Sequence, residues 1–434
     1  MEPKLRNPRS RFHLWSSVSK VNGARKNATE WHIWCLVVSK ASIYSVFGFG
    51  ALGFQYLPAV VSEKGIGMHI VRFFPIGNAD TCLIELANGR RILFDFADVG
   101  NPDDADDKRC DLEKELRSIL GDDKTIDVVA FTHLDRDHCH RAKDIFYLEH
   151  AAKYQDDDRI KIKTLWVPAH AVLEVGVEGQ ARTLRAEARH RFLNGEGVRV
   201  FSRPQELDDF LEKNEIDPAK RRNLISDAGT LCPEFNHAHD GVEFFVHSPF
   251  GKRDQDNVVR VRNNDALFMQ ATFDVGGQQT KMVLAADVTH SVIDDIVRVT
   301  KYHGREERLQ WDINNIPHHC SYLSLSDEKG TDKTEPTEAS KWLYEECGRE
   351  GGLMVSTSKP IPSDDADVQP PHRQAAAYYK DVARKLCGQW VVSMEHPSVS
   401  KPAPLVIEID SNGYKIRKNA PNVIVTTVTP RAGV

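Results

Sequence analysis

The sequence predicts an α/β protein built from two β-sheets with helices on their outer faces. Short apolar runs typical of strands alternate with amphipathic segments typical of helices. These elements fall into two blocks, one before residue 150 and one after residue 240, and a charged region separates them. Strands and helices that recur in two blocks favour two packed sheets with helices outside, which is a layered α/β arrangement.

The first block starts at Met68 and is rich in strands. In order it contains a strand, two strands of a hairpin, a short helix and a buried strand, at residues 69–74, 81–86, 91–96, 112–120 and 126–131. The hairpin follows from Asn88-Gly89, because an Asn-Gly pair between two apolar runs is a strong turn signal. Residues 150–240 are then predicted to form a charged helical insertion, which is either solvated or faces a substrate.

The second block repeats the strand-rich pattern. It contains a strand, a second hairpin, a helix, a strand, another helix and two final strands, at residues 242–247, 266–273 with 281–286, 291–302, 352–356, 374–386, 390–393 and 405–409. The domain is therefore expected to span residues 68–410, and residues 411–434 are expected to form a C-terminal tail.

Residues 1–67 differ from the rest of the chain. They carry nine Lys/Arg and three Asp/Glu, a net of +6, whereas the whole chain has −6 and the remainder therefore −12. Residues 41–61 contain no charge, and 21 such residues are long enough to span a bilayer. The extension is thus an artefactual or disordered segment, a membrane anchor, or a packed accessory segment. Met68 is an alternative start.

Composition excludes some classes of function. The chain has 434 residues, of which 41% are hydrophobic and 28% charged, as in soluble globular proteins. A body with a net charge of −12 is a poor general binder of polyanions. The eight cysteines are scattered without a CxxC pair, which favours reduced thiols and a cytoplasmic location over a disulfide framework.

The strongest chemical signal directly follows the strand at residues 126–131. The segment Thr132 to His138 places four possible metal ligands within six residues, namely His133, Asp135, Asp137 and His138. A strand end holds its exit loop in place, so this segment predicts a divalent metal site. Imidazole and carboxylate groups are the ligands that zinc and similar ions take at about 2.0–2.2 Å.

Two further strand ends carry suitable donors. Asp287 follows the apolar run at 281–286, and its carboxylate is suited to bridge two ions. His318 or His319 follows a strand-like segment and supplies another imidazole. Three separate strand ends that deliver His or Asp are a more specific signal than any one of them.

These motifs resemble the metallo-β-lactamase superfamily, most closely the hydrolase domain of bacterial competence (DNA-uptake) channel proteins and their free-standing relatives. The corresponding segments are Gly77 to Leu86, Ile92 to Asp95, Thr132 to His138, Asn263 to Asp265, Ala286-Asp287 and Pro317 to Ser321. The resemblance implies an αββα four-layer sandwich with one or two metal ions at one edge between the sheets.

The chain departs from the family at several positions. Many members have His where Asp135 stands, and another His where Asn263 or Asn264 stands. The first metal site is thus poor in ligands, and the harder donors shift the preference from Zn²⁺ toward Mn²⁺ or Mg²⁺. Cys139 and Cys320, beside the two His motifs, are expected mainly to pack.

The resemblance and the ligand set imply a metal-dependent hydrolase, most specifically of phosphodiester bonds. His133, Asp135, Asp137, His138, Asp287 and His318 are the candidate metal ligands, and Asp135, Asp137 and His319 the candidate catalytic residues. A small molecule or a nucleic acid is the expected substrate. Two alternatives stay open: a hydrolase of a small ester, lactone or cyclic nucleotide, and a degenerate protein that binds a metal for regulation.

Overall fold

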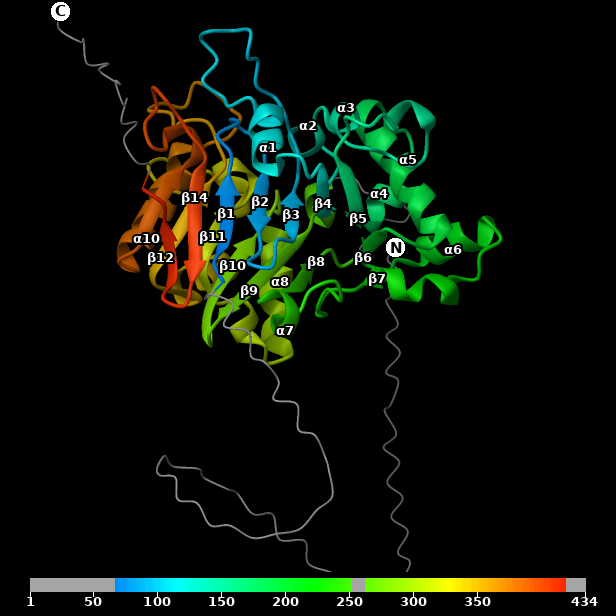
Figure 1. Ribbon diagram of the computed structural model, residues 1–434. Helices are drawn as coiled ribbons and strands as arrows, with labels where there is room; N and C mark the ends of the chain where they lie inside the picture. Colours follow the sequence, from blue (N-terminus) through cyan, green and yellow to red (C-terminus); the bar gives the residue numbers. More distant parts are fainter. Residues whose placement is uncertain (1–66, 252–261, 419–434) are drawn as a thin grey trace, which may run out of the picture. The chain divides into compact units, whose positions relative to one another are not determined.

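The computed structural model describes residues 67–251 and 262–418 (Figure 1). Nearly all of the expected extension, including the uncharged run at 41–61, lies outside these residues. Within the described residues, every helix is too short or too polar to cross a membrane. All elements discussed below belong to the unit that begins at Glu63.

The first sheet has nine strands. Their spatial order is β15 (Gly413–Ile416), β14 (Leu405–Asp410), β1 (His69–Phe73), β2 (Cys82–Glu85), β3 (Arg91–Phe94), β4 (Thr125–Ala130), β5 (Lys161–Pro168), β6 (Val198–Phe201) and β7 (Ile225–Ser226). Pairing is antiparallel from β15 to β3 and parallel from β3 to β7. Parallel strands end at the same edge, which makes the ends of β3 and β4 neighbours.

The second sheet has six strands. Their order is β13 (Gln389–Val392), β12 (Gly348–Ser356), β11 (Trp311–Ile316), β10 (Gln278–Leu284), β9 (Phe268–Val275) and β8 (Val242–Ser248). The predicted second hairpin is confirmed as β9 and β10, which pair antiparallel, whereas β10 and β11 run parallel. The ends of β10 and β11 therefore also lie at one edge.

The strands bury both faces, as β4 illustrates. Val128 and Ala130 belong to the core between the two sheets, whereas Val129 and Phe131, the residue directly after the strand, belong to a second core on the outer face of the first sheet. This split follows from the two-residue period of a strand, which sends successive side chains to opposite faces. A strand buried on both faces reads as a continuous apolar run, which is why this segment was recognisable in the sequence.

Helices complete the outer cores. On the first sheet these are α1 (Leu112–Leu120), α2 (Arg136–Cys139), α3 (Ala142–Ile145), α4 (Ala169–Leu173), α5 (Gly179–Asn194) and α6 (Gln205–Lys213), and on the second sheet α8 (His290–Tyr302), α9 (Glu338–Lys341) and α10 (Arg373–Lys385). A further short helix, α7 (His237–Asp240), precedes β8. The predicted mixed α/β class with two sheets is confirmed.

Helix α1 shows why its bounds were predictable. Asp111 accepts a hydrogen bond from the backbone N–H of Lys114 and so caps the first turn. Gly121 follows the last turn with a φ of 58°, a conformation that favours glycine. Leu112, Leu116 and Leu120 form the buried stripe.

Two sequence predictions need correction. Residues 150–240 are not simply a helical insertion, because β5, β6 and β7 extend the first sheet within them. Their short runs lie among charged helices, whose composition dominated the prediction. The C-terminal tail was also placed too early, since β15 pairs with β14 and residues 411–418 belong to the sheet edge.

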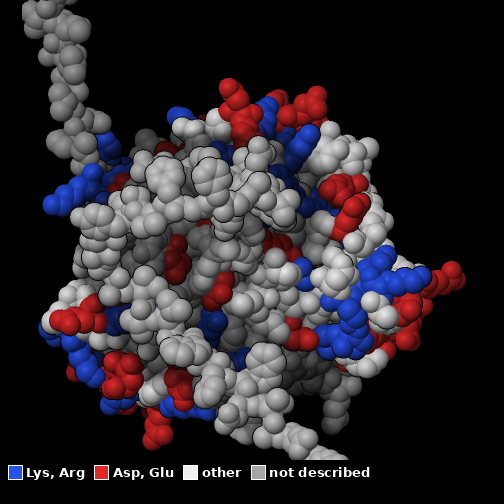
Figure 2. Space-filling view, turned by 60° about the horizontal axis from the view of Figure 1, so that its bottom comes forward, with Lys and Arg blue, Asp and Glu red and all other residues white. Residues whose placement is uncertain are grey.

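Charges are interspersed on the face that Figure 2 presents. Among the described residues visible there, Lys/Arg and Asp/Glu side chains alternate around a largely uncharged centre. That face therefore offers no continuous basic surface, in line with the expectation that the body is a poor general polyanion binder.

Candidate metal centre

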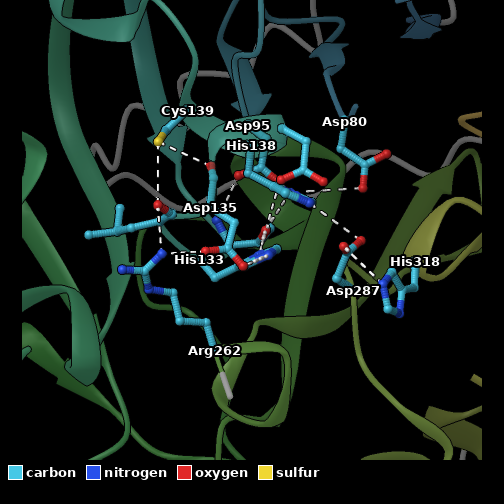
Figure 3. A network of polar contacts seen from close by, with 12 residues as sticks. Asp80, Asp95, His133, Asp135, His138, Cys139, Arg262, Asp287 and His318 are labelled. Atoms are coloured by element: carbon cyan, nitrogen blue, oxygen red, sulfur yellow. Dashed lines mark hydrogen bonds and ion pairs between the residues drawn. The ribbon is translucent and has the colours of Figure 1, made fainter. Parts of the chain in front are cut away.

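Segments that leave five strands converge on one point. Asp80 lies in the loop between β1 and β2, Asp95 follows β3, His138 lies in the short helix after β4, and Asp287 follows β10 (Figure 3). His319 follows β11. Backbone hydrogen bonds join these segments. They run from the N–H of Asp80 to Asp137 O at 3.0 Å, from Phe96 to His138 O at 3.0 Å, and from His318 to Ala286 O at 3.0 Å. Backbone hydrogen bonds therefore hold these segments close together.

Four of these side chains form a compact group of donors. Asp80, His138, Asp287 and His319 each offer one ligand atom, and all four atoms lie within 4.8 Å of one another. All four residues are buried. Buried charges require partners or a metal, so a closely spaced and buried pair of carboxylates and pair of imidazoles is suited to hold a cation.

Hydrogen bonds at Nδ1 fix the orientation of the imidazoles of His138 and His319. His138 Nδ1 lies 2.8 Å from Asp95 Oδ2, and His319 Nδ1 lies 2.9 Å from the carbonyl oxygen of Thr357. A proton on each Nδ1 satisfies these acceptors and leaves the Nε2 lone pair directed at the group. Metal-binding histidines in proteins are commonly fixed in this way.

Buried polar atoms that lack a hydrogen bond indicate whether the donor group suits a cation. Asp80 Oδ1, His138 Nε2 and Asp287 Oδ1 are buried and have no hydrogen-bond partner within residues 67–251 and 262–418. His138 Nε2 and Asp287 Oδ1 are only 3.3 Å apart, but they form an ion contact without hydrogen-bond geometry. A divalent cation would satisfy all three atoms. The mixed imidazole and carboxylate set suits Zn²⁺ or Mn²⁺.

Without a cation, protons balance the charge of the site. Burial lowers the pKa of His319, but Asp287, Asp137 and Asp80 outweigh it and raise this pKa to about 9. Burial is likewise outweighed at His138, whose pKa the carboxylates of Asp287 and Asp95 raise well above its usual value. At neutral pH both imidazoles are thus protonated in the metal-free protein, and a bound cation must displace those protons.

The carboxylates respond in different directions. Burial raises the pKa of Asp80 to about 6, although His319 and His138 oppose the change. At Asp287, burial also favours the neutral form, but the two imidazoliums outweigh it and hold the pKa well below its usual range. Asp287 is therefore the permanently charged member of the group.

His133 and Asp135 lie on the other side of His138. His133 is fully buried, and its Nε2 lies 3.6 Å from Asp135 Oδ2. Asp135 is itself in contact with the guanidinium of Arg262 (Figure 3). This guanidinium also binds both carboxylate oxygens of Glu174. Burial keeps the pKa of His133 well below its usual value, so this imidazole is neutral. The predicted ligands His133 and Asp135 thus stand apart from the compact group.

Asp137 and His318 border the group. Asp137 Oδ2 lies 3.2 Å from His319 Nε2, and its side chain is 37% exposed, so it marks the mouth of the site. His318 Nε2 lies 3.9 Å from Asp287 Oδ2. The donor group contains His319 and not His318, between which the sequence motif left the choice of ligand open.

The site has an unusual concentration of strained backbone. Asp95, Ala286, His318, His319 and Cys320 all have positive φ angles between 40° and 67°. For residues other than glycine such conformations cost about 1–3 kcal/mol each and cluster at functional sites. Ala286 and Cys320 stand where the resembled family has glycine, and the positive φ angles explain why glycine suits both positions.

Two acids were missed as site residues. Asp80 and Asp95 were noted only as parts of the motifs that carry the resemblance. Asp80 belongs to the donor group, and Asp95 accepts from Thr132 N–H at 2.7 Å, from Thr132 Oγ1 at 2.6 Å and binds His138. Their positions directly before β2 and directly after β3 were the available signals.

The two cysteines beside the motifs are buried. Cys139 Sγ lies 3.2 Å from the carbonyl oxygen of Asp135, and burial raises the pKa of this thiol to about 12. Burial also raises the pKa of Cys320 well above its usual range. Both residues therefore pack as neutral thiols, as expected.

Comparison with known proteins adds no further constraint. No family model matches the chain, and a search of curated proteins finds no match. The functional argument therefore depends on the geometry of this site and on the resemblance of its motifs.

Proposed function

We propose that this protein is a metal-dependent hydrolase of phosphodiester bonds with a metallo-β-lactamase-like αββα domain. The observation that supports it most is the buried group of Asp80, His138, Asp287 and His319, delivered by separate strand ends to one edge of the two sheets. The order of these residues along the chain follows the motifs of that superfamily. The layers of helix, sheet, sheet and helix agree with the same assignment.

A bound divalent ion would supply a water of lowered pKa and would offset negative charge on the phosphate. The chain supplies the rest of the chemistry. Asp80, His138, Asp287 and His319 would hold the ion, while Asp95 and the carbonyl of Thr357 fix the two imidazoles. This buried arrangement keeps the donors fixed while the substrate reacts.

Asp137 is the proposed proton acceptor. Its side chain is the partly exposed carboxylate at the mouth of the site, and an imidazole that binds the ion through Nε2 no longer donates to it. Asp137 Oδ2 is then free to accept the proton of the attacking water. Asp135 is less suited to this task because Arg262 already neutralises it.

The test combines metal analysis with activity. Full-length protein is expected to bind about one Mn²⁺ or Zn²⁺ per chain and to hydrolyse bis(p-nitrophenyl) phosphate. Asp287→Asn is expected to lose both properties, and Asp137→Asn only the activity. Hydrolysis that persists in Asp287→Asn or after chelation would refute the proposal. Stable metal binding without hydrolysis of phosphodiesters or small esters would instead favour a regulatory protein.

A further inference from the structure

An open groove adjoins the proposed metal centre at Asp137. It has a volume of about 490 Å³ and is lined by Ile76, Gly77, Asn78, Val99, Arg109, Arg136, Asp137 and Lys359. Three of these residues are cations that come from different parts of the chain. A substrate held at the metal would thus extend past Asp137 into a basic groove.

Two of the three cations have no acidic partner. Arg136 and Lys359 are exposed, and neither side chain forms an ion pair with any residue that the structure describes. Arg136 only makes a long contact of 3.5 Å to His140 Nδ1. Arg109 differs, because Asp107 binds its guanidinium at 2.6 Å and offsets its charge. Arg136 and Lys359 therefore outweigh the one carboxylate that lines the groove, Asp137, and give the groove its net positive charge.

The floor of the groove brings the cations together. Gly77 has a φ of 84°, and a Cβ added there would lie 3.4 Å from Arg109 Cδ and 3.9 Å from Lys359 Cγ. A side chain at this position would thus enter the space between the two cations, and the backbone conformation itself favours glycine. Asn78 fixes the opposite wall, since its Oδ1 accepts a hydrogen bond from Lys359 N–H at 2.9 Å.

We propose that this groove is a subsite for a second phosphate of the substrate, held by Arg136 and Lys359 next to the phosphodiester that is cleaved. This inference rests on the proposed function. Unpaired cations at the rim of a groove bind phosphate through charge-assisted hydrogen bonds, and guanidinium does so with two parallel bonds. The groove holds only a few such groups, so recognition is local and does not need the broad basic surface that the acidic body lacks.

The experiment compares two substrates that share one scissile bond. Thymidine 5′-(p-nitrophenyl phosphate) carries one phosphate, and its 3′-phosphorylated form carries a second one. In both, water adds to the 5′-phosphorus and the bond to p-nitrophenolate breaks, so release of p-nitrophenol reports the same step. The wild-type protein with Mn²⁺ is expected to have a kcat/KM about tenfold higher for the 3′-phosphorylated form, mainly through KM.

The double variant Arg136→Ala/Lys359→Ala is expected to bring that preference close to one. The control Arg182→Ala/Lys220→Ala removes two exposed cations outside the groove and is expected to keep the tenfold preference. Equal use of both substrates by the wild type, or a preference that survives in the groove variant, would overturn the subsite while leaving the proposed hydrolase intact.

Binding separates the subsite from the hydrolase. Calorimetry with thymidine 3′,5′-bisphosphate and Mn²⁺ requires no turnover. If neither substrate is cleaved but the groove variant binds this ligand about tenfold more weakly than the control, the subsite stands and the hydrolase proposal fails. Equal binding by the two variants would overturn the subsite.

Discussion

The residues on the two sides of the His138 imidazole differ in how their charges and donor atoms are paired. On one side, Asp80, Asp287 and His319 point donor atoms at a common centre and leave several of them unsatisfied. On the other side, His133 faces Asp135, whose charge is already balanced by Arg262 (Figure 3). The first side has the donor atoms of a ligand shell. On the second side Asp135 is already paired with Arg262, although His133 Nε2 is also buried and has no hydrogen-bond partner among the described residues.

The difference shows how a segment rich in possible metal ligands can contribute to only one compact donor group. The segment from residue 132 to residue 138 contains the donors for two ions, but Arg262 supplies a fixed positive charge where a second ion would need Asp135. A guanidinium is always charged and is anchored here by Glu174 as well. We therefore expect one tightly bound ion rather than two.

Loss of a ligand on the complete side should have the largest effect. Asp287→Asn keeps the volume but removes the permanent negative charge, so Mn²⁺ affinity should fall more than about 100-fold, beyond the 10–100-fold typical of residues that only support ligands. His133→Asn, on the other side, should change that affinity by less than about threefold. Isothermal titration calorimetry measures both, and thermal melting checks the fold. Equal losses in the two variants would contradict the comparison.

Metal affinity should also depend strongly on pH, because protons occupy the complete side. The pKa of His319 is raised to about 9, so its imidazole is protonated throughout pH 6 to 8 and must lose a proton when the ion binds. The imidazole of His138, whose pKa is also raised well above its usual value, must lose a proton as well. Apparent Mn²⁺ affinity should therefore rise about 100-fold per pH unit across that range and become less steep only near pH 9. Competition with a calibrated chelator measures it.

A pH profile that contradicts this prediction would be easy to recognise. A histidine of ordinary pKa would give an affinity that stops rising near pH 6.5. A flat profile from pH 7 to 8 would show that carboxylates do not hold protons on the imidazoles of the metal-free site. His133→Asn serves as the matched control and should keep the slope of the parent, since burial keeps His133 neutral.

Loss of a residue that only orients a metal ligand should lower Mn²⁺ affinity less than loss of the ligand itself. Asp95→Asn keeps the shape of the side chain but weakens its hold on His138 Nδ1, which lies 2.8 Å away. Mn²⁺ affinity should fall about tenfold, within the range seen for such partners in other metal sites. Asp265→Asn is a matched control, because Asp265 contacts His170 Nδ1 at 3.3 Å in an equally buried pair outside the donor group. A loss in the control equal to that in Asp95→Asn would show a general effect of buried carboxylates.

The sequence predicted what depends on local pattern. The strand before Thr132 is a continuous apolar run and α1 has both its capping residues, so both were recognised from a few neighbouring residues. Strands β5 to β7 were missed because they lie among charged helices. They become strands by pairing, in order, β5 with β4, β6 with β5 and β7 with β6. Pairing of this kind is a property of the whole sheet.

The residues of the site likewise divide into those that a local sequence pattern reveals and those that only the folded chain reveals. His138 and Asp287 could be named as donors because they follow strands, whereas Asp80 and Asp95 are single acids whose role depends on where two distant loops meet. His318 and His319 are neighbours of the same type, and only the turn of the backbone decides that His319 Nε2 lies 3.6 Å from Asp287. The contact of Arg262 with Asp135 joins residues 127 positions apart, so no local pattern could reveal it.

That contact gives the smallest expected effect and the sharpest test of the comparison. Arg262→Ala should free Asp135 beside His133 and so permit a second, weaker ion, which raises the Mn²⁺ content from about one to nearly two per chain at millimolar Mn²⁺. The affinity of the first site should change by less than about threefold. Arg203→Ala, which breaks a comparable ion pair with Asp208, is the control and should leave the content at one. If Arg262→Ala also binds only one ion, then the poverty of donors around His133 limits the site, rather than the guanidinium that neutralises Asp135.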